Sequence, residues 1–305
     1  MRRIVPAILT LLMLASCTKQ EATISSDDAA RRDSLALHVA VVPVMDCMPI
    51  YYAQRMGMFD SLGVDVRLLE FQSLMDVDTA LNQRHAQLGY TSLPRLVIME
   101  QEGKDTLHEV AGLEGKLYLL TAHTKRIRNL KQLKERMVAL ERHSAADYWS
   151  DQLMKEAALD QADIYRPQFN DIGLRTTMLT SQLVDAALLP EPQASIARFK
   201  GNRQIAETND STVRLSCIAC TPEVLSDSLR KTQQERFLKA YDKAVNALNK
   251  TPNPDTIAMI LRKDYRLSHE LADSIVLPKF QTTSEPSPLS RQTVINWIKG
   301  RQQQR

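Results

Sequence analysis

This sequence of 305 residues has few cysteines, few aromatic side chains and little net charge. Beyond its first 16 residues, no apolar run reaches the roughly 20 residues that a membrane-spanning helix needs. The formal charge is +3, and it falls to +1 when residues 1–16 are removed, because Arg2 and Arg3 are lost. A near-neutral chain gives no indication of a nucleic-acid partner.

Motifs of catalysis and metal binding are also scarce. We find no nucleophile elbow, phosphate loop or Ser–His–Asp arrangement, and the six histidines show no paired metal spacing. Cys217 and Cys220 have the gap of a zinc or redox pair, but they lie in or just after a predicted strand, so we expect two buried, inert thiols. The sequence therefore predicts no metal, no cofactor and no enzymatic activity.

The first residues resemble an export sequence. Arg2 and Arg3 precede an apolar stretch over 4–14, and Leu14-Ala-Ser leads to Cys17. This layout predicts a lipoprotein signal peptide over 1–16, with lipid attached to Cys17 as the first mature residue. The polar residues that follow predict a flexible tether over 17–36. We expect an exported protein anchored by its lipid to a bacterial membrane, facing the periplasm or the cell exterior.

The remaining body of about 270 residues alternates apolar strands with amphipathic helices, which predicts an α/β fold with parallel βαβ units. Predicted strands cover 37–42, 64–69, 87–90, 107–111, 117–122, 137–140, 164–169, 184–189, 203–206 and 213–219. After residue 221 the pattern becomes helical, with helices over 233–250, 256–262, 269–276 and 289–299. Residues 125–210 form their own strand–helix series between two flanking strands. This order predicts an inserted second lobe and a hinge of two crossing strands.

The segment from Met48 to Leu68 carries the strongest local pattern. Pro49 suits the first position of a helix, and Gly57 and Gly63 suit left-handed turns that end two short helices. The apolar alternation that follows predicts a half-buried strand. A strand, a loop and a helix start in this order form a common ligand-binding unit of α/β proteins.

Three motifs in chain order resemble type II periplasmic substrate-binding proteins of ABC transporters. They are PIYYAQRMGMF from Pro49 with GVDV from Gly63, NLKQLK from Asn129 with MVAL from Met137, and VDAALLPEPQA from Val184. The branch they resemble most serves sulfonates, nitrate-like solutes and thiamine-precursor pyrimidines.

This resemblance implies two lobes, each a mostly parallel sheet flanked by helices, joined by the hinge and followed by a helical C-terminal segment. Lobe 1 would cover 37–122 and 215–305, and lobe 2 would cover 123–214. It also implies a monomer that captures a small molecule, without a cofactor, and delivers it to an ABC permease of the inner membrane.

The chain departs from the family pattern in two ligand loops. The third strand reads HAQLGY from His85, without the Asp that the family often has, and ERHSAAD from Glu141 replaces a Gly or Ser-Thr run. The substrate is therefore expected to differ from those of the better-known members.

Candidate ligand contacts in the first lobe are Asp46, Cys47, Met48, Tyr51 and Ser92. Asp46 can accept a hydrogen bond from a ligand amine or cap the helix that starts at Pro49. Tyr51 or its neighbour can stack on a flat ligand, while the other belongs to the core. Cys47 and Met48, with Met45 nearby, can hold Cu(I) or line an adaptable apolar wall, and the wall is favoured.

Ser92, Ser144 and Glu191 are candidates at other helix starts. Each serine can cap its helix or bind the ligand, and the helix N-terminus after Ser144 favours a polar or anionic group. Two flanking prolines fix the backbone around Glu191. With Asp46, its carboxylate favours a neutral or amine-bearing heterocycle, such as a pyrimidine, over a sulfonate.

Two alternatives remain open at this stage. One is an enzyme of pyrimidine, thiamine-precursor or menaquinone-type biosynthesis on the same scaffold, since fold does not settle function. The other is a tethered interaction module whose cleft is vestigial.

Overall fold

The computed structural model describes residues 26–103, 107–208 and 212–303. The signal peptide and Cys17 lie outside these residues. The chain divides into two units, 1–35 and 36–305. The described part of the first unit is a helix, α1 (Ser26–Leu35), so the prediction of a flexible tether throughout 17–36 is wrong here. The helix contains several good helix formers, namely Ala29, Ala30, Arg31, Arg32 and Leu35.

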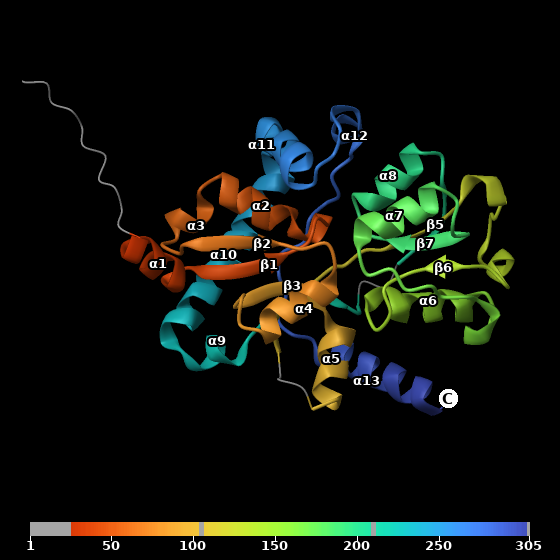
Figure 1. Ribbon diagram of the computed structural model, residues 1–305, viewed down its shortest axis with the longest axis horizontal. Helices are drawn as coiled ribbons and strands as arrows, with labels where there is room; N and C mark the ends of the chain where they lie inside the picture. Colours follow the sequence, from red (N-terminus) through yellow and green to blue (C-terminus); the bar gives the residue numbers. More distant parts are fainter. Residues whose placement is uncertain (1–25, 104–106, 209–211, 304–305) are drawn as a thin grey trace, which may run out of the picture. The chain divides into compact units, whose positions relative to one another are not determined.

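The second unit contains two sheets. The first sheet has the order β2-β1-β3-β9-β4 and forms lobe 1 (Figure 1). Strand β1 pairs in parallel with both β2 and β3, whereas β9 runs antiparallel to its neighbours β3 and β4. The strands are β1 (Leu37–Val41), β2 (Val66–Glu70), β3 (Leu88–Ser92), β4 (His108–Leu113) and β9 (Ser216–Cys220).

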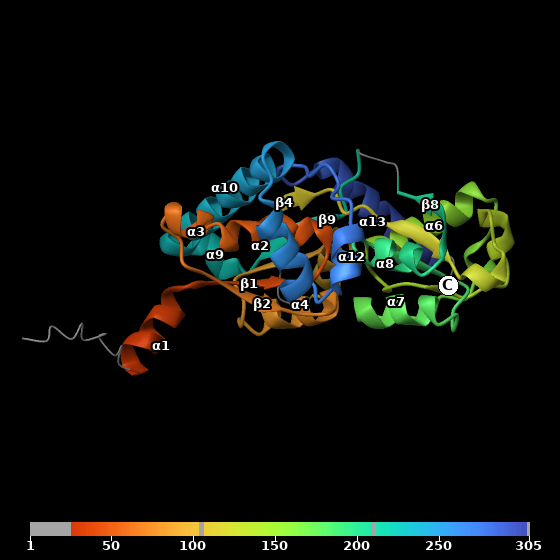
Figure 2. The same ribbon diagram turned by 90° about the horizontal axis from the view of Figure 1, so that it is seen from above.

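Strand β1 is a near-continuous apolar run because helices cover both faces of its sheet. Helix α4 (Leu74–Asn82) and helix α10 (Ser228–Lys250) lie on opposite faces (Figure 2). Predicted apolar positions of α10, Phe237, Tyr241 and Val245, are all buried. Further helices of this lobe are α5 (Leu93–Gln101), α9 (Pro222–Ser226), α11 (Pro254–Met259) with its π-helical continuation (Ile260–Asp264), and α12 (His269–Ser274).

The second sheet has the order β6-β7-β5-β8 and forms lobe 2. In this sheet β5 runs opposite to the common direction of β6, β7 and β8, as β9 does in the first sheet. Most strands of each sheet therefore point the same way, as predicted, although the β6–β7 pair is the parallel one here. Helix α6 lies on one side of this sheet and helices α7 and α8 on the other (Figure 1). The elements are β5 (Tyr118–Thr121), β6 (Val138–Ala139), α6 (Ala145–Glu156), α7 (Ile172–Thr180), β7 (Ala186–Leu189), α8 (Gln193–Phe199) and β8 (Arg203–Glu207).

Two segments cross between the lobes, one from β4 to β5 and one from β8 to β9. They lie side by side, because the Thr208 N–H donates to the Leu117 carbonyl at 3.0 Å and the Leu117 N–H donates to the Thr208 hydroxyl at 3.1 Å. Since β5 belongs to the second sheet, the predicted lobe boundary after Ala122 is wrong, and lobe 2 begins by Tyr118. Both flanking strands are apolar, so the sequence does not show to which sheet each belongs.

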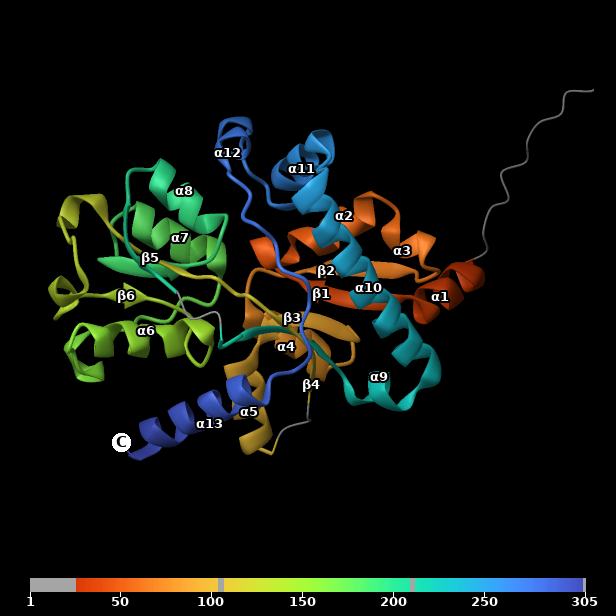
Figure 3. The same cartoon turned by 180° about the vertical axis from the view of Figure 1, so that it is seen from behind.

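Helix α13 (Pro288–Gln303) corrects the assignment of the whole C-terminal segment to lobe 1. It packs against α5 and reaches towards α6 of lobe 2 (Figure 3). Its buried residues Val294 and Ile298 share a core with Leu119 and Leu188 of lobe 2. The last helix therefore spans both lobes.

The opening segment folds as predicted. Helix α2 (Met48–Arg55) has Pro49 in its first turn and α3 (Met58–Ser61) follows. Gly57 and Gly63 have φ of 63° and 66°. The predicted strand over 164–169 is wrong: the segment makes only isolated bridges beside β6, at Tyr165 and Gln168, because Pro167 between them has no N–H to donate.

Among the described residues, no helix is both long and apolar enough to span a bilayer.

Candidate functional site

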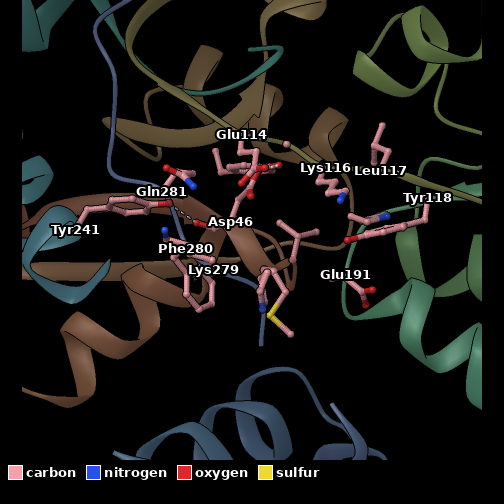
Figure 4. Close-up of a pocket in the computed structure, with 16 residues that line it drawn as sticks. Asp46, Glu114, Lys116, Leu117, Tyr118, Glu191, Tyr241, Lys279, Phe280 and Gln281 are labelled. Atoms are coloured by element: carbon pink, nitrogen blue, oxygen red, sulfur yellow. Dashed lines mark hydrogen bonds between the residues drawn. The ribbon is translucent and has the colours of Figure 1, made fainter. Parts of the chain in front are cut away.

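A cavity of about 430 Å³ lies where the lobes meet the first crossing segment (Figure 4). Lobe 1 contributes the loop after β1, strand β3 and helix α10, and lobe 2 contributes the turn between β7 and α8. The extended segment after α12 covers one further side. The residues that line it are Val44, Met45, Asp46, Tyr90, Glu114, Gly115, Lys116, Leu117, Tyr118, Pro190, Glu191, Tyr241, Pro278, Lys279, Phe280 and Gln281.

Asp46 is the central carboxylate of this cavity. Desolvation by the surrounding protein raises its pKa from 3.8 to about 6; the hydrogen bond from Tyr90 lowers it and the nearby Glu114 carboxylate raises it further. The Tyr90 hydroxyl donates to its Oδ2 at 2.9 Å. No side-chain capping bond forms at the start of α2, so Asp46 is a cavity residue and not the helix cap.

Tyrosine hydroxyls hold the Asp46 loop in place. Tyr241 donates to the Asp46 carbonyl at 3.0 Å, and Tyr265 donates to the Val44 carbonyl at 2.6 Å. Tyr90 is also within 3.1 Å of the Ser216 hydroxyl. The loop is thus fixed by α10 and by the segment after it, both far away in sequence.

The opposite wall combines an aromatic ring with paired charges. Figure 4 shows Tyr118 and Glu191 across the cavity from Asp46 and Glu114. The Arg198 guanidinium lies 5.2 Å from the Tyr118 ring centroid and also pairs with Glu191. Burial raises the pKa of Tyr118 to about 12, so its hydroxyl stays protonated at neutral pH. Lys116 Nζ lies 5.4 Å from the same centroid, so this wall presents an aromatic ring with two cations beside it.

The lobes touch directly at the mouth of the cavity. The Met45 N–H donates to the Glu191 carbonyl at 2.8 Å, and Gln193 Nε2 donates to the Pro43 carbonyl at 2.9 Å. The Glu191 side chain accepts from the Ser195 N–H at 3.0 Å. Glu191 therefore both caps the start of α8 and lines the cleft, which are the two roles that its position suggested.

Three candidates of the first loop lie elsewhere. Cys47 and Met48 are fully buried in the core of lobe 1, and neither lines the cavity. Tyr51 is also buried, with its ring 5.4 Å from that of Tyr265 in an edge-to-face arrangement. Tyr52 is a core residue too, so both tyrosines stabilise the fold. Only Met45 of the suggested sulfur cluster contacts the cavity.

Ser92 and Ser144 do not line the cavity either. Ser92 stands at the N-cap position of α5 but makes no capping bond, and its buried hydroxyl has no partner among the described residues. Ser144 caps α6 by accepting from the Ala146 N–H at 3.1 Å.

The N-terminus of α6 is neutralised by the protein itself. The Asp147 carboxylate, fully buried in the first turn, accepts from the His143 N–H at 2.8 Å and pairs with Arg301. This helix start, which the sequence suggested for an anionic ligand group, already holds an anion of its own.

The sequence did not mark Glu114, Tyr118, Tyr241 or Phe280 as site residues, and it placed Tyr241 on the buried face of α10. Glu114 and Tyr118 lie in and just after the first crossing segment, and Tyr241 and Phe280 lie in the C-terminal part. The predicted hinge was the one feature of the sequence that indicated the first two. Cys217 and Cys220 are buried and unpaired, as predicted, and burial raises the pKa of both thiols. No group of three or more His, Cys, Asp or Glu is placed to hold a metal within the described residues.

Two α/β lobes joined by crossing segments, with a cavity at their junction, define the type II periplasmic-binding-protein fold. The chain belongs to the NMT1/THI5 like family, whose family model matches residues 44–254. A comparison with curated protein sequences gives no match.

Solved structures agree on the fold. The periplasmic aliphatic sulphonate binding protein SsuA from Escherichia coli superposes with a TM-score of 0.70 at 20% identity, over 87% of this chain and 92% of that one. The alkanesulfonate-binding SsuA from Xanthomonas axonopodis, bound to MOPS, gives 0.74 at 14% identity, over 87% and 91%. The nitrate-binding NrtA from Synechocystis gives 0.69 at 13% identity, over 83% and 74%. At such identities the likeness establishes the fold alone.

Proposed function

We propose that this protein is a solute receptor that captures a small organic molecule between its lobes for an ABC importer. The observation that carries the proposal is the cavity at the junction of two lobes, lined by residues from both. A hinge of two crossing segments allows closure around a ligand. Solute-binding proteins from three bacteria share this fold, which supports the same role here.

The charges of the cavity favour a neutral or amine-bearing heterocycle, such as a pyrimidine. Asp46 and Glu114 lie on one side and can accept hydrogen bonds from a ligand, and the Tyr118 ring can contact a flat ligand. Lys116 is paired with Glu207 at 3.1 Å, and the start of α6 is occupied by Asp147. The lining holds three carboxylates, of Asp46, Glu114 and Glu191, against the ammonium groups of Lys116 and Lys279, so we infer that a sulfonate or nitrate is less favoured here.

The N-terminal sequence supports an exported lipoprotein anchored through Cys17, and the family resemblance supports a monomer. We infer a binding role and no catalytic one, because the solved structures that share this fold include sulfonate- and nitrate-binding proteins. The enzyme alternative predicts turnover of a bound precursor, and replacing Asp46 or Glu191 would abolish it.

Native mass spectrometry of the protein purified from its own cells tests the proposal. We expect one co-purified small molecule with an amine or ring nitrogen, released on unfolding. A thermal-shift screen of pyrimidines, amines, sulfonates and inorganic anions should then give a rise in melting temperature with the first two classes. Failure of every class would contradict solute capture, and a response to sulfonates alone would contradict the proposed ligand class.

A further inference from the structure

A second set of charges joins the lobes away from the cavity. It alternates in sign through Asp78 of α4, Arg95 of α5, Glu141 after β6 and Arg175 of α7. The first two belong to lobe 1 and the last two to lobe 2. The side chains of Asp78, Glu141 and Arg175 are at most 5% exposed and that of Arg95 is 14% exposed. None of the four lines the cavity.

Arg95 lies between the two carboxylates. Its Nε pairs with the Asp78 carboxylate, and its Nη1 lies 3.6 Å from Oε1 of Glu141. The Thr91 hydroxyl donates to the other oxygen of Asp78 at 2.6 Å. Glu141 also lies 3.9 Å from Arg175 of its own lobe. Only the contact between Arg95 and Glu141 joins the lobes by opposite charges in this cluster.

The two carboxylates repel each other when the lobes meet. Burial is the main reason that the pKa of Glu141 rises to about 7; Arg175 and Arg95 lower it, and Asp78 raises it. The adjoining backbone also joins the lobes here, since the Ile172 N–H donates to the Gln72 carbonyl at 2.9 Å. When both acids are ionised, a cation between them therefore favours this contact.

We propose that Arg95 is a positioning residue for lobe closure, because it supplies the cation between two carboxylates that closure brings together from opposite lobes. Each lobe keeps its own ion pair on opening: Asp78 with Arg95, and Glu141 with Arg175. Opening therefore leaves no buried charge without a partner, which makes the contact reversible. The inference rests on the hinge closure of the proposed function, and it places control of ligand affinity outside the ligand cavity.

An interlobe distance measurement without added solute tests this role. We would label Lys239→Cys on α10 and Lys131→Cys in lobe 2, both exposed, with spin labels in a soluble form that begins after Cys17, since the described thiols are buried. Pulsed electron spin resonance at pH 8 then gives the distribution of distances. For Arg95→Met we expect the ratio of closed to open molecules to fall on the order of tenfold, as for loss of one charged contact.

The double variant Arg95→Met/Glu141→Gln distinguishes positioning from simple structural loss. It removes the repulsion together with the cation, so we expect the closed population to recover to within about threefold of the wild type. Lys125→Met is the matched control, because its pair with Asp185 at 3.2 Å lies within lobe 2. An unchanged distance distribution in Arg95→Met, or a double variant as open as the single one, would overturn the proposal.

A variant in lobe 2 covers the case in which Arg95→Met does not fold. Glu141→Lys leaves the Asp78–Arg95 pair intact and places a third cation between two arginines, so it should open the lobes as well. Unchanged distances in Glu141→Lys would equally overturn the proposal. Because no solute is added, failure to find a ligand would weaken the proposed function and leave these distances as an independent result.

Discussion

Replacing Arg301 by methionine should destabilise the whole protein, because this side chain joins the last helix to lobe 2. Its Nη1 and Nη2 lie 2.7 and 2.8 Å from the two oxygens of Asp147, and its Nε lies 2.8 Å from Asp151. The guanidinium also stacks 4.7 Å from the Trp297 ring centroid. Asp147 is fully buried, so the substitution leaves a desolvated carboxylate with fewer partners.

The loss of unfolding free energy depends on the partners that Asp147 keeps. Breaking a buried ion pair from one side costs about 3–5 kcal/mol. Asp147 keeps the His143 N–H at 2.8 Å and Arg142 at 3.3 Å, so we expect the lower end, about 3 kcal/mol. For a body of this size the free energy of unfolding falls by about 3 kcal/mol per molar urea. A loss of about 3 kcal/mol therefore lowers the urea midpoint of unfolding by about 1 M.

Chemical denaturation at two pH values checks this account. Burial raises the pKa of Asp147, but the bonds from Arg301 more than offset it and hold the pKa below its usual value. The pair therefore contributes stability above the unfolded pKa, and this stability is lost as the pH falls through the folded pKa. Without Arg301 the folded pKa rises, so the deficit of the variant should be largest at pH 7–8 and shrink towards pH 4.

The matched control is Arg262→Met, whose pair with the exposed Asp273 at 2.7 Å should change stability by about 0.5 kcal/mol or less. An Arg301→Met variant within 1 kcal/mol of the wild type at pH 7.5 would refute the reasoning.

Three further predictions concern the cavity, the crossing segment and the core. Because the folded pKa of Asp46 is raised to about 6, its contribution to stability should fall as the pH rises from 4 to 6. The free energy of unfolding of Asp46→Asn relative to wild type should therefore be about 1–2 kcal/mol more favourable at pH 8 than at pH 5, and an equal difference at both pH values would count against this. Gly115→Ala places a Cβ at φ 64° against the Ser216 hydroxyl and 2.7 Å from Ser216 Cβ, so it should cost about 1 kcal/mol more than Gly57→Ala, whose Cβ has nothing within 4 Å; equal melting curves would refute this. The three described cysteines are buried, so a thiol reagent should label them only after unfolding, and labelling of the native protein would contradict their burial.

The sequence allowed most elements of the fold to be predicted, because apolar alternation and helical periodicity determine which faces are buried. Strand β1, helix α10 and the turns at Gly57 and Gly63 follow directly from such local patterns. The boundary near Ala122 failed for a physical reason: β5 is as apolar as the strands of lobe 1, and only pairing with β7 and β8 assigns it to the second sheet. The bridging role of α13 depends on contacts 150 residues apart, such as Arg301 with Asp151.

The candidate site was predicted only in part. Asp46 and Glu191 stand at loop positions that a parallel fold directs to one edge, and both line the cavity. Cys47, Met48 and Tyr51 follow Asp46 in sequence, but a short helical turn directs them into the core. The remaining walls come from long-range packing, for which the sequence offers no local pattern.

The most direct test of the central claim is an isothermal titration of an aminopyrimidine and of an alkanesulfonate into the wild type and Asp46→Asn at pH 8. We expect the aminopyrimidine to bind the wild type at micromolar or tighter affinity, about tenfold or more weaker binding to the variant, and no heat from the sulfonate. Sulfonate binding that Asp46→Asn leaves unchanged or strengthens, with no response to the aminopyrimidine, would contradict the account.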